Sequence, residues 1–163
     1  MNYFFKTIAS PVGKLKLIAS DHGLVAVQWD KEKPKHSPVK WDVVVENKNH
    51  PILLKTEKQI QEYFTHKRRS FSLKLDIQGT PFQKRVWMAL MSIPYGDTKS
   101  YGDIAKQIQH PKASRAVGAA NGKNPVPIII PCHRVIGSSG KLVGFTGGLA
   151  KKEKLLSIEK TSI

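Results

Sequence analysis

Residues 98–122, TKSYGDIAKQIQHPKASRAVGAANG, decide the fold of the C-terminal half of the chain. Either Thr98 or Ser100 can cap a short helix at its start. Pro111 ends that helix, and a second short helix follows over residues 113–121. Two short helices joined by a tight turn are typical of a helix-turn-helix, a motif that places its second helix against DNA.

The flanking sequence sets the boundaries of this half. Gly79-Thr80-Pro81 predicts a domain boundary, because Thr80 can cap a helix whose first position is Pro81. Gly147-Gly148 precedes a last predicted helix over Leu149–Glu159. We therefore divide the chain into an N-terminal domain, residues 1–78, and a C-terminal domain, residues 79–163.

The N-terminal domain is predicted to pair short strands with one helix. Alternating apolar residues, separated by glycine-containing turns, indicate strands. These are Tyr3–Ile8, Lys14–Ala19, Leu24–Trp29, Trp41–Val45 and Phe71–Ile77, with a helix over Pro51–Tyr63. The expected fold class is α+β. A small α/β domain with an antiparallel sheet precedes a mainly helical domain with a helix-turn-helix, similar to a winged helix.

The charge of the chain points to an anionic partner. Among 163 residues, 27 are Lys or Arg and 12 are Asp or Glu, a formal net charge of +15. Residues 1–78 hold 14 bases and 8 acids, and residues 79–163 hold 13 bases and 4 acids. Between Asp103 and Glu153 there is no acidic residue. A basic field of this size favours nucleic acid, with phosphates held along one face.

Composition excludes several other classes. With 40% hydrophobic residues the chain is expected to fold rather than stay disordered. The longest apolar run, residues 126–131, is too short to span a bilayer. The first twenty residues lack the apolar block of a signal peptide, so a cytoplasmic protein with no membrane partner is expected.

A single cysteine concentrates the chemistry at one place, PCHRV at residues 131–135. One cysteine forms neither an internal disulfide nor a cysteine zinc cluster. Cys132 becomes a nucleophile as the thiolate, and His133 could accept its proton if a carboxylate fixed the imidazole. Only Glu153 and Glu159 follow Asp103. Arg134 is expected to form a structural salt bridge, and Val126–Ile130 to be a buried extended segment.

The whole segment NPVPIIIPCHRVIG, residues 124–137, strongly resembles the active-site segment of the O6-alkylguanine-DNA alkyltransferases, also called methylated-DNA–protein-cysteine methyltransferases. Further motifs stand in family order and spacing. They are Thr80-Pro81-Phe82-Gln83, Ser100-Tyr101-Gly102, Ser114-Arg115-Ala116-Val117-Gly118 and Gly147-Gly148-Leu149 with Lys152. The resemblance covers essentially all of residues 79–163 and, more weakly, the β-hairpin at the start of the chain.

The resemblance implies a role for five catalytic residues. Cys132 is the implied alkyl acceptor, and His133 with Glu159 is the implied relay that removes the thiol proton through water. Asn124 is implied to support the active-site turn. Tyr101 is implied to bind the flipped guanine and to protonate it as it leaves.

The resemblance also implies a set of residues that bind DNA or the base. Arg115 would fill the gap left by the flipped nucleotide, and carbonyls of Cys132 and Val135 would accept from its exocyclic amine. The remaining implied contacts are Ser114, Ala116, Gly118, Phe145, Thr146 and Gly147. Phe145 departs from the tyrosine that relatives usually carry, which puts any role of that phenol hydroxyl in doubt.

The implied activity is DNA repair by a single-turnover methyltransferase. The alkyl group of O6-alkylguanine would move irreversibly to Cys132 after base flipping, with O4-alkylthymine as a second candidate substrate. The implied partner is double-stranded DNA, approached through its minor groove by a monomer. No cofactor and no metal are expected. Some family members bind zinc in the N-terminal domain, but this chain has no second cysteine with which to build that site.

Two alternatives remain open at this point. The basic half could be a helix-turn-helix module that binds DNA without chemistry, although the presence of Cys132 argues against it. The chain could instead be a cysteine hydrolase that uses Cys132 and His133. Such enzymes usually separate the two residues in sequence and place the cysteine at a helix start, which Pro131 fits poorly.

Overall fold

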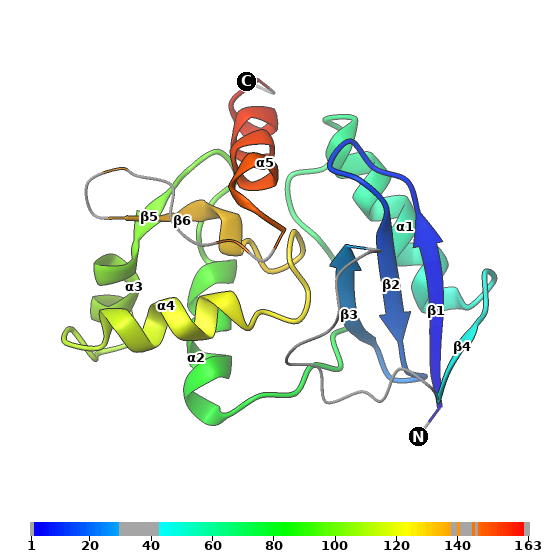
Figure 1. Ribbon diagram of the computed structural model, residues 1–163, viewed down its shortest axis with the longest axis horizontal. Coiled ribbons are helices and arrows are strands. Elements are labelled where there is room, and N and C mark those ends of the chain that lie inside the picture. Colours follow the sequence, from blue (N-terminus) through cyan, green and yellow to red (C-terminus); the bar gives the residue numbers. More distant parts are fainter. Residues whose placement is uncertain (1, 30–42, 138–139, 141–144, 146, 162–163) are drawn as a thin grey trace. The chain divides into compact units, whose positions relative to one another are not determined.

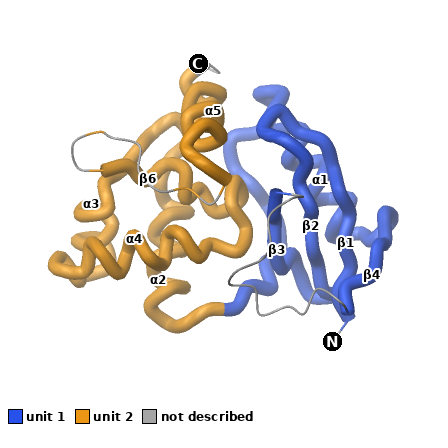
Figure 2. The backbone as a smooth tube through the Cα atoms, in the orientation of Figure 1, with its two compact units in different colours: residues 1–78 blue, residues 79–163 orange. Residues whose placement is uncertain are grey.

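The structure, a computed structural model, describes residues 2–29, 43–137, 140, 145 and 147–161. The chain forms two compact units, Met1–Gln78 and Gly79–Ile163 (Figure 2). Within the described residues, no helix is both long and apolar enough to cross a membrane.

A four-stranded sheet forms the first unit (Figure 1). Its strands are β1 (Tyr3–Ile8), β2 (Leu15–Ala19), β3 (Leu24–Trp29) and β4 (Val44–Glu46), in the order β3-β2-β1-β4. The first three confirm the predicted strands to within one residue. One helix, α1 (Pro51–Phe64), packs on this sheet. Its buried residues include Leu53, Ile60 and Tyr63, which give it one apolar face.

Two details of this unit differ from the sequence prediction. The sheet is mixed rather than antiparallel, because β4 runs parallel to β1. The predicted strand Phe71–Ile77 is wrong, since only Leu75 forms an isolated bridge, with Leu24. The alternation there is real, but only two backbone hydrogen bonds join the segment to Leu24. Trp41 and Asp42, from the fourth predicted strand, lie outside the described residues.

Four helices dominate the second unit. They are α2 (Pro81–Met91), α3 (Tyr101–Gln107), α4 (Ser114–Gly122) and α5 (Leu149–Thr161). The helix-turn-helix prediction is confirmed as α3 and α4, which pack against each other and against α2 (Figure 1). Capping explains two of the helix starts. Thr80 forms a capping box with Gln83, and Ser100 rather than Thr98 forms one with Asp103.

The segment before the cysteine is a tight turn rather than the extended segment expected. The N–H of Ile130 donates to the carbonyl of Val126 at 2.9 Å, and Ile128 has φ 76°. The side chains of Val126 and Ile128–Ile130 are buried, as predicted. A β-branched residue in the left-handed region costs about 1–3 kcal/mol. Burial of the isoleucines therefore holds a strained backbone directly before Cys132.

A short pair of parallel strands joins the helix-turn-helix to the cysteine segment. β5 (Lys99–Ser100) pairs with β6 (Val135–Ile136). Between Pro131 and β6 lies a 3-10 turn, η2 (Cys132–Arg134), which contacts α5. The start of α3 is thus hydrogen-bonded to the backbone that follows the cysteine.

Candidate active site

Cys132 begins η2 and is buried, with 2% of its surface exposed. Burial raises the pKa of its thiol to about 11, although a hydrogen bond from Asn124 and the positive charge of Lys152 oppose that rise. At pH 7 a thiol with this pKa is ionised in about one molecule in ten thousand. The resting cysteine is therefore a protected thiol that needs a base to become a nucleophile.

Asn124 closes the turn that carries the cysteine. Its Nδ2 donates to the carbonyl of Ile130 at 2.7 Å, and its Oδ1 accepts from the N–H of Val126 at 3.0 Å. A third interaction reaches the Cys132 thiol. One buried amide thus holds both ends of the strained turn and touches the sulfur. This geometry is consistent with the supporting role implied for Asn124.

His133 and Glu159 form a buried pair. His133 Nε2 lies 2.6 Å from Glu159 Oε2, and both side chains are at most 1% exposed. Burial lowers the pKa of His133 even though Glu159 raises it, so the imidazole is neutral at pH 7. Nε2–H then donates to the carboxylate, which leaves Nδ1 as an acceptor. Nδ1 is buried and has no hydrogen-bond partner among the described residues.

Glu159 is also held by the guanidinium of Arg134. Arg134 Nε lies 2.8 Å from Oε1 and Nη2 lies 3.0 Å from Oε2, while Arg134 Nη1 donates to the carbonyl of Ile93. The N–H of Gly96 also donates to Oε1, at 3.1 Å. Burial alone would raise the pKa of Glu159, but the hydrogen bonds from His133 and Arg134 lower it to about 2. Arg134 therefore forms the structural salt bridge expected for it.

The structure distinguishes the two carboxylates, Glu153 and Glu159, that the sequence offered as partners of His133. Glu159 is buried on the face of α5 that meets η2, whereas Glu153 is exposed on the same helix. Only Glu159 hydrogen-bonds to His133. The structure thus brings Cys132, His133, Glu159 and Asn124 together in one buried cluster.

Lys152 is a residue of this cluster that the sequence analysis did not assign to the site. It is fully buried, and its Nζ donates to the carbonyl of Val135 at 2.6 Å. Burial lowers the pKa of Lys152, and the charge of a Cys132 thiolate raises it. The sequence pattern that could have assigned Lys152 to the site is its spacing, since Lys152, Leu155 and Glu159 share one helical face. Lysine side chains are usually exposed, so Lys152 is not counted among the buried positions of the helix when the sequence alone is read.

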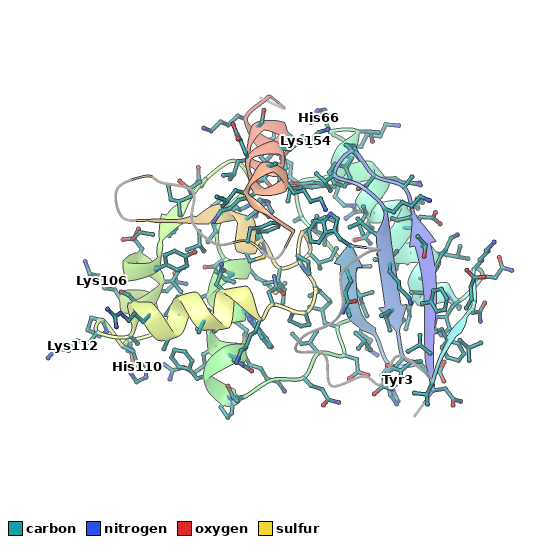
Figure 3. All side chains as sticks on the ribbon, in the orientation of Figure 1. Tyr3, His66, Lys106, His110, Lys112 and Lys154 are labelled. Atoms are coloured by element: carbon teal, nitrogen blue, oxygen red, sulfur yellow. The ribbon has the colours of Figure 1, made fainter. Side chains whose placement is uncertain are left out.

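The charge of Lys152 is expected to be measurable in the reactivity of the thiol. Lys152→Gln removes the charge but keeps an N–H donor, so the Cys132 pKa should rise and alkylation by iodoacetamide should slow by about tenfold. The matched control is Lys154→Gln, because Lys154 is exposed on the same helix (Figure 3). Equal alkylation rates for Lys152→Gln and wild type would show that Lys152 does not influence the thiol.

Tyr101 is the first residue of α3 and is half-buried. Burial, and then the negative charge of a Cys132 thiolate, raise its pKa, which keeps the phenol protonated. A Cβ atom added at Gly118 on α4 would lie 3.8 Å from the Tyr101 ring. Such a distance is an ordinary van der Waals contact, so this part of α4 lies beside the phenol ring.

The exposed side of the helix-turn-helix is basic. Arg115 and Ala116 are exposed on α4, whereas Ser114 and Gly118 are half-buried. Lys106, His110 and Lys112 lie around the turn between the two helices (Figure 3). Such a surface fits a phosphate backbone.

The remaining predicted residues lie near the start of α5. Phe145 and Gly147 are half-buried, and the N–H of Gly148 donates to the carbonyl of Phe145 at 2.9 Å. Thr146 lies outside the described residues. In the part of the chain that the structure describes, no three His, Cys, Asp or Glu side chains are grouped so as to hold a metal ion.

The fold and the site define a helix-turn-helix protein whose second unit carries a buried cysteine beside a histidine–glutamate pair. Two family models match this chain. The 6-O-methylguanine DNA methyltransferase DNA binding domain matches residues 81–161, and the ribonuclease-like domain of the same proteins matches residues 3–77. The chain therefore belongs to the methylated-DNA–protein-cysteine methyltransferase family.

Individual relatives agree with this assignment. The methylated-DNA–protein-cysteine methyltransferase of Methanosarcina acetivorans is 47% identical over 96% of this chain and 97% of its own length. That of Mycobacterium tuberculosis is 44% identical over 96% of this chain and 92% of its own. Among solved structures, the M. tuberculosis protein in complex with DNA has a TM-score of 0.86 at 42% identity and covers 99% of this chain and 94% of its own.

Proposed function

We propose that this chain repairs DNA by moving the alkyl group of O6-alkylguanine to Sγ of its own Cys132. The observation that carries the proposal is the neutral His133, which is held by Glu159 and follows the buried Cys132 in sequence, and whose Nδ1 has no hydrogen-bond partner among the residues that the structure describes. This arrangement provides a base for a cysteine that is otherwise protonated at neutral pH. Family membership supports the same activity.

The first step is removal of the thiol proton. The acceptor Nδ1 of His133 takes the proton of Cys132 through a bridging water, and Glu159 stabilises the imidazolium that forms. The charge of Lys152 and the hydrogen bond from Asn124 favour the thiolate. Because the site is buried, these interactions are stronger than they would be in water.

The second step is displacement at the alkyl carbon. The thiolate attacks this carbon in line, a carbon–sulfur bond forms, and the carbon–O6 bond breaks with its electron pair left on the guanine. We assign Tyr101 the donation of a proton to the leaving base, and its raised pKa, which keeps the phenol protonated, supports this role. The product is a thioether, which this site has no means to hydrolyse, so each molecule acts once.

In this proposal, α4 and the basic turn before it bind the DNA. We place α4 in the minor groove of double-stranded DNA, with a single copy of the chain acting on each lesion. Reaction on a base inside a duplex requires its extrusion, which costs a few kcal/mol of stacking and pairing. Arg115 is exposed near the N-terminus of α4, in a position to occupy the vacated space. Residues 1–78 are assigned a supporting role.

Mass spectrometry after mixing with an O6-methylguanine oligonucleotide tests the proposal against its alternatives. A gain of one methyl group on the peptide containing Cys132 supports transfer. Binding without any gain in mass would indicate a lesion-binding module. Turnover of an acyl substrate would indicate a hydrolase, although Cys132 begins a 3-10 turn rather than an α-helix.

Arg115→Ala is expected to slow transfer from duplex DNA by about a hundredfold while leaving reaction with free O6-methylguanine base unchanged. Only the duplex reaction includes extrusion of the nucleotide. Loss of about 3 kcal/mol of stabilisation of the extruded state by Arg115 corresponds to a hundredfold slower rate. The measurement is the single-turnover rate with each substrate. Lys123→Ala, which removes an exposed cation just after α4, is the control for general loss of charge. Equal losses on both substrates would place Arg115 in the chemistry or in folding.

A further inference from the structure

Arg85 is an exposed residue of α2 that neither the sequence motifs nor the mechanism above uses. Its Nη2 donates to the carbonyl of Ile108, and its Nη1 lies 3.2 Å from Nε2 of His110. Phe82, one turn earlier on α2, meets the His110 ring edge-on, with 6.3 Å between the two ring centroids. Two side chains of α2 therefore contact the turn that joins α3 to α4, where His110 lies (Figure 3).

This turn contains a residue in the left-handed conformation. The N–H groups of Gln109 and His110 fold back onto carbonyls of α3, a hydrogen-bond pattern that commonly ends a helix. Glycine usually takes the left-handed position of this pattern, but Gln109 occupies it here with φ 65°. The carbonyl of Ile108 lies past the last turn of α3, where the helix supplies no donor. Arg85 supplies one from another helix.

The start of α4 depends on the same turn for its position. Ala113, which precedes α4, gives the helix no side-chain cap, and its own N–H donates to the carbonyl of His110 at 2.9 Å. Arg115, which the proposal above places in the vacated space of the duplex, follows as the second residue of α4. A displacement of the turn would therefore move the residues that meet DNA.

An arginine suits the two acceptors that Arg85 meets. Because every N–H of a guanidinium is a donor, His110 Nε2 accepts this hydrogen bond, and the ring proton lies on Nδ1. The Ile108 carbonyl lies at the other terminal nitrogen. A guanidinium reaches both acceptors at once through its rigid fork, whereas the ammonium of a lysine is a single point. The substitution Arg85→Lys therefore keeps the charge but gives up one of the two contacts.

We propose that Arg85 is a positioning residue for DNA binding, an inference that rests on the role proposed above for α4. Arg85 holds the turn to α2 and thereby fixes where α4 begins, without itself contacting a phosphate. Its two terminal nitrogens are already engaged by the turn. When one of these contacts is lost, the turn shifts relative to α2, and Lys112 and Arg115 meet the duplex less favourably.

The duplex affinity of a charge-preserving variant tests the proposal. Arg85→Lys is titrated with an undamaged duplex oligonucleotide by fluorescence anisotropy at several salt concentrations, beside Arg85→Met, which also removes the charge. The matched control is Lys84→Arg, a second charge-preserving exchange at the neighbouring exposed position of α2. The melting temperature and the rate of methyl transfer from free O6-methylguanine base are measured for each protein.

We expect Arg85→Lys to bind the duplex about fivefold more weakly than wild type, as for the loss of one exposed hydrogen bond. The slope of log affinity against log salt concentration should not change, because the charge is kept. Arg85→Met should show a similar loss, with its slope reduced by less than the value of about 0.9 that a lost phosphate contact gives. Lys84→Arg should bind like wild type, and all variants should keep the wild-type melting temperature and free-base rate.

Two results would overturn the proposal. Wild-type affinity for Arg85→Lys, together with a slope flattened by about 0.9 for Arg85→Met, would make Arg85 a phosphate contact. A lowered melting temperature with unchanged duplex affinity would leave Arg85 a purely structural role. The binding measurements need no lesion. If wild type transferred no methyl group, the proposed repair function would fail, while the affinities of the variants would still decide the role of Arg85.

Discussion

Cys132→Ala is expected to abolish methyl transfer entirely while duplex affinity stays within about threefold of wild type. Cys132 is the sole cysteine among the 163 residues, so no other thiol can accept the alkyl group. Affinity is retained because contacts with phosphates dominate binding and the basic residues of the helix-turn-helix are untouched. Transfer is followed by mass spectrometry and binding by fluorescence anisotropy at fixed salt concentration.

The control for this prediction is structural. Removing a buried sulfur leaves a small cavity, which should lower the free energy of unfolding by about 1–2 kcal/mol without unfolding the protein. A melting curve of the variant verifies this. A methyl gain on the alanine variant would contradict the identity of the acceptor, and a large loss of duplex affinity would show that the thiol takes part in binding.

The second large effect is expected for Glu159→Gln. This substitution should also destabilise the fold, because Glu159 holds the buried Arg134. Breaking a buried ion pair on one side costs about 3–5 kcal/mol. The methyl transfer rate at pH 7 should fall by about a hundredfold, because a neutral amide stabilises the His133 imidazolium poorly. It should recover partly at alkaline pH, where hydroxide ionises the thiol.

The acid stability of the two proteins provides a separate measurement. The pKa of Glu159 is lowered in the folded protein to about 2 from an ordinary value of 4.5. Its ionised form therefore stabilises the fold fully above pH 4.5, and this contribution is lost as the pH falls from 4.5 towards 2. Urea unfolding of wild type should weaken over that range. Glu159→Gln should lack this pH-dependent contribution. The free energies of unfolding of wild type and of the variant should therefore converge as the pH falls from 4.5 towards 2.

Glu153→Gln is the matched control, because Glu153 is exposed on the same helix. Its stability, transfer rate and pH profile should equal those of wild type. If Glu159→Gln gave the same pH profile and the same rate as wild type, Glu159 would have no part in activating the thiol. In that case His133 or the local backbone would act without it.

Much of the second unit could be predicted because its helix boundaries depend on local sequence. Thr80 followed by Pro81, and Ser100 followed by Asp103, define helix starts that need no tertiary information. The likeness of residues 124–137 to a known active-site segment led to Cys132 and His133, and the resemblance of residues 79–163 as a whole led to Glu159. Their proximity depends on the fold, in which His133 Nε2 lies 2.6 Å from Glu159 Oε2.

The features that could not be predicted depend on contacts distant in sequence. The buried positions of α5 include Lys152 and Glu159 alongside Leu155, so a search for apolar periodicity finds no clear face. Ile128 adopts a left-handed conformation that β-branched residues avoid, and only the surrounding burial explains it. The alternation of Phe71–Ile77 indicates a strand, but the segment meets the edge strand β3 only at Leu24, through the single bridge of Leu75.

The β5–β6 pairing has a consequence for the evolvability of the protein. Ser100 of β5 is in register with Ile136 of β6. Tyr101 directly follows β5, and Cys132 lies three residues before the start of β6. The spacing between phenol and thiol is therefore set by main-chain bonds, which substitutions of side chains leave intact. Exposed residues of α3 and α4 can accordingly drift, altering affinity for DNA or preference for flanking sequence, while the reacting groups keep their mutual alignment.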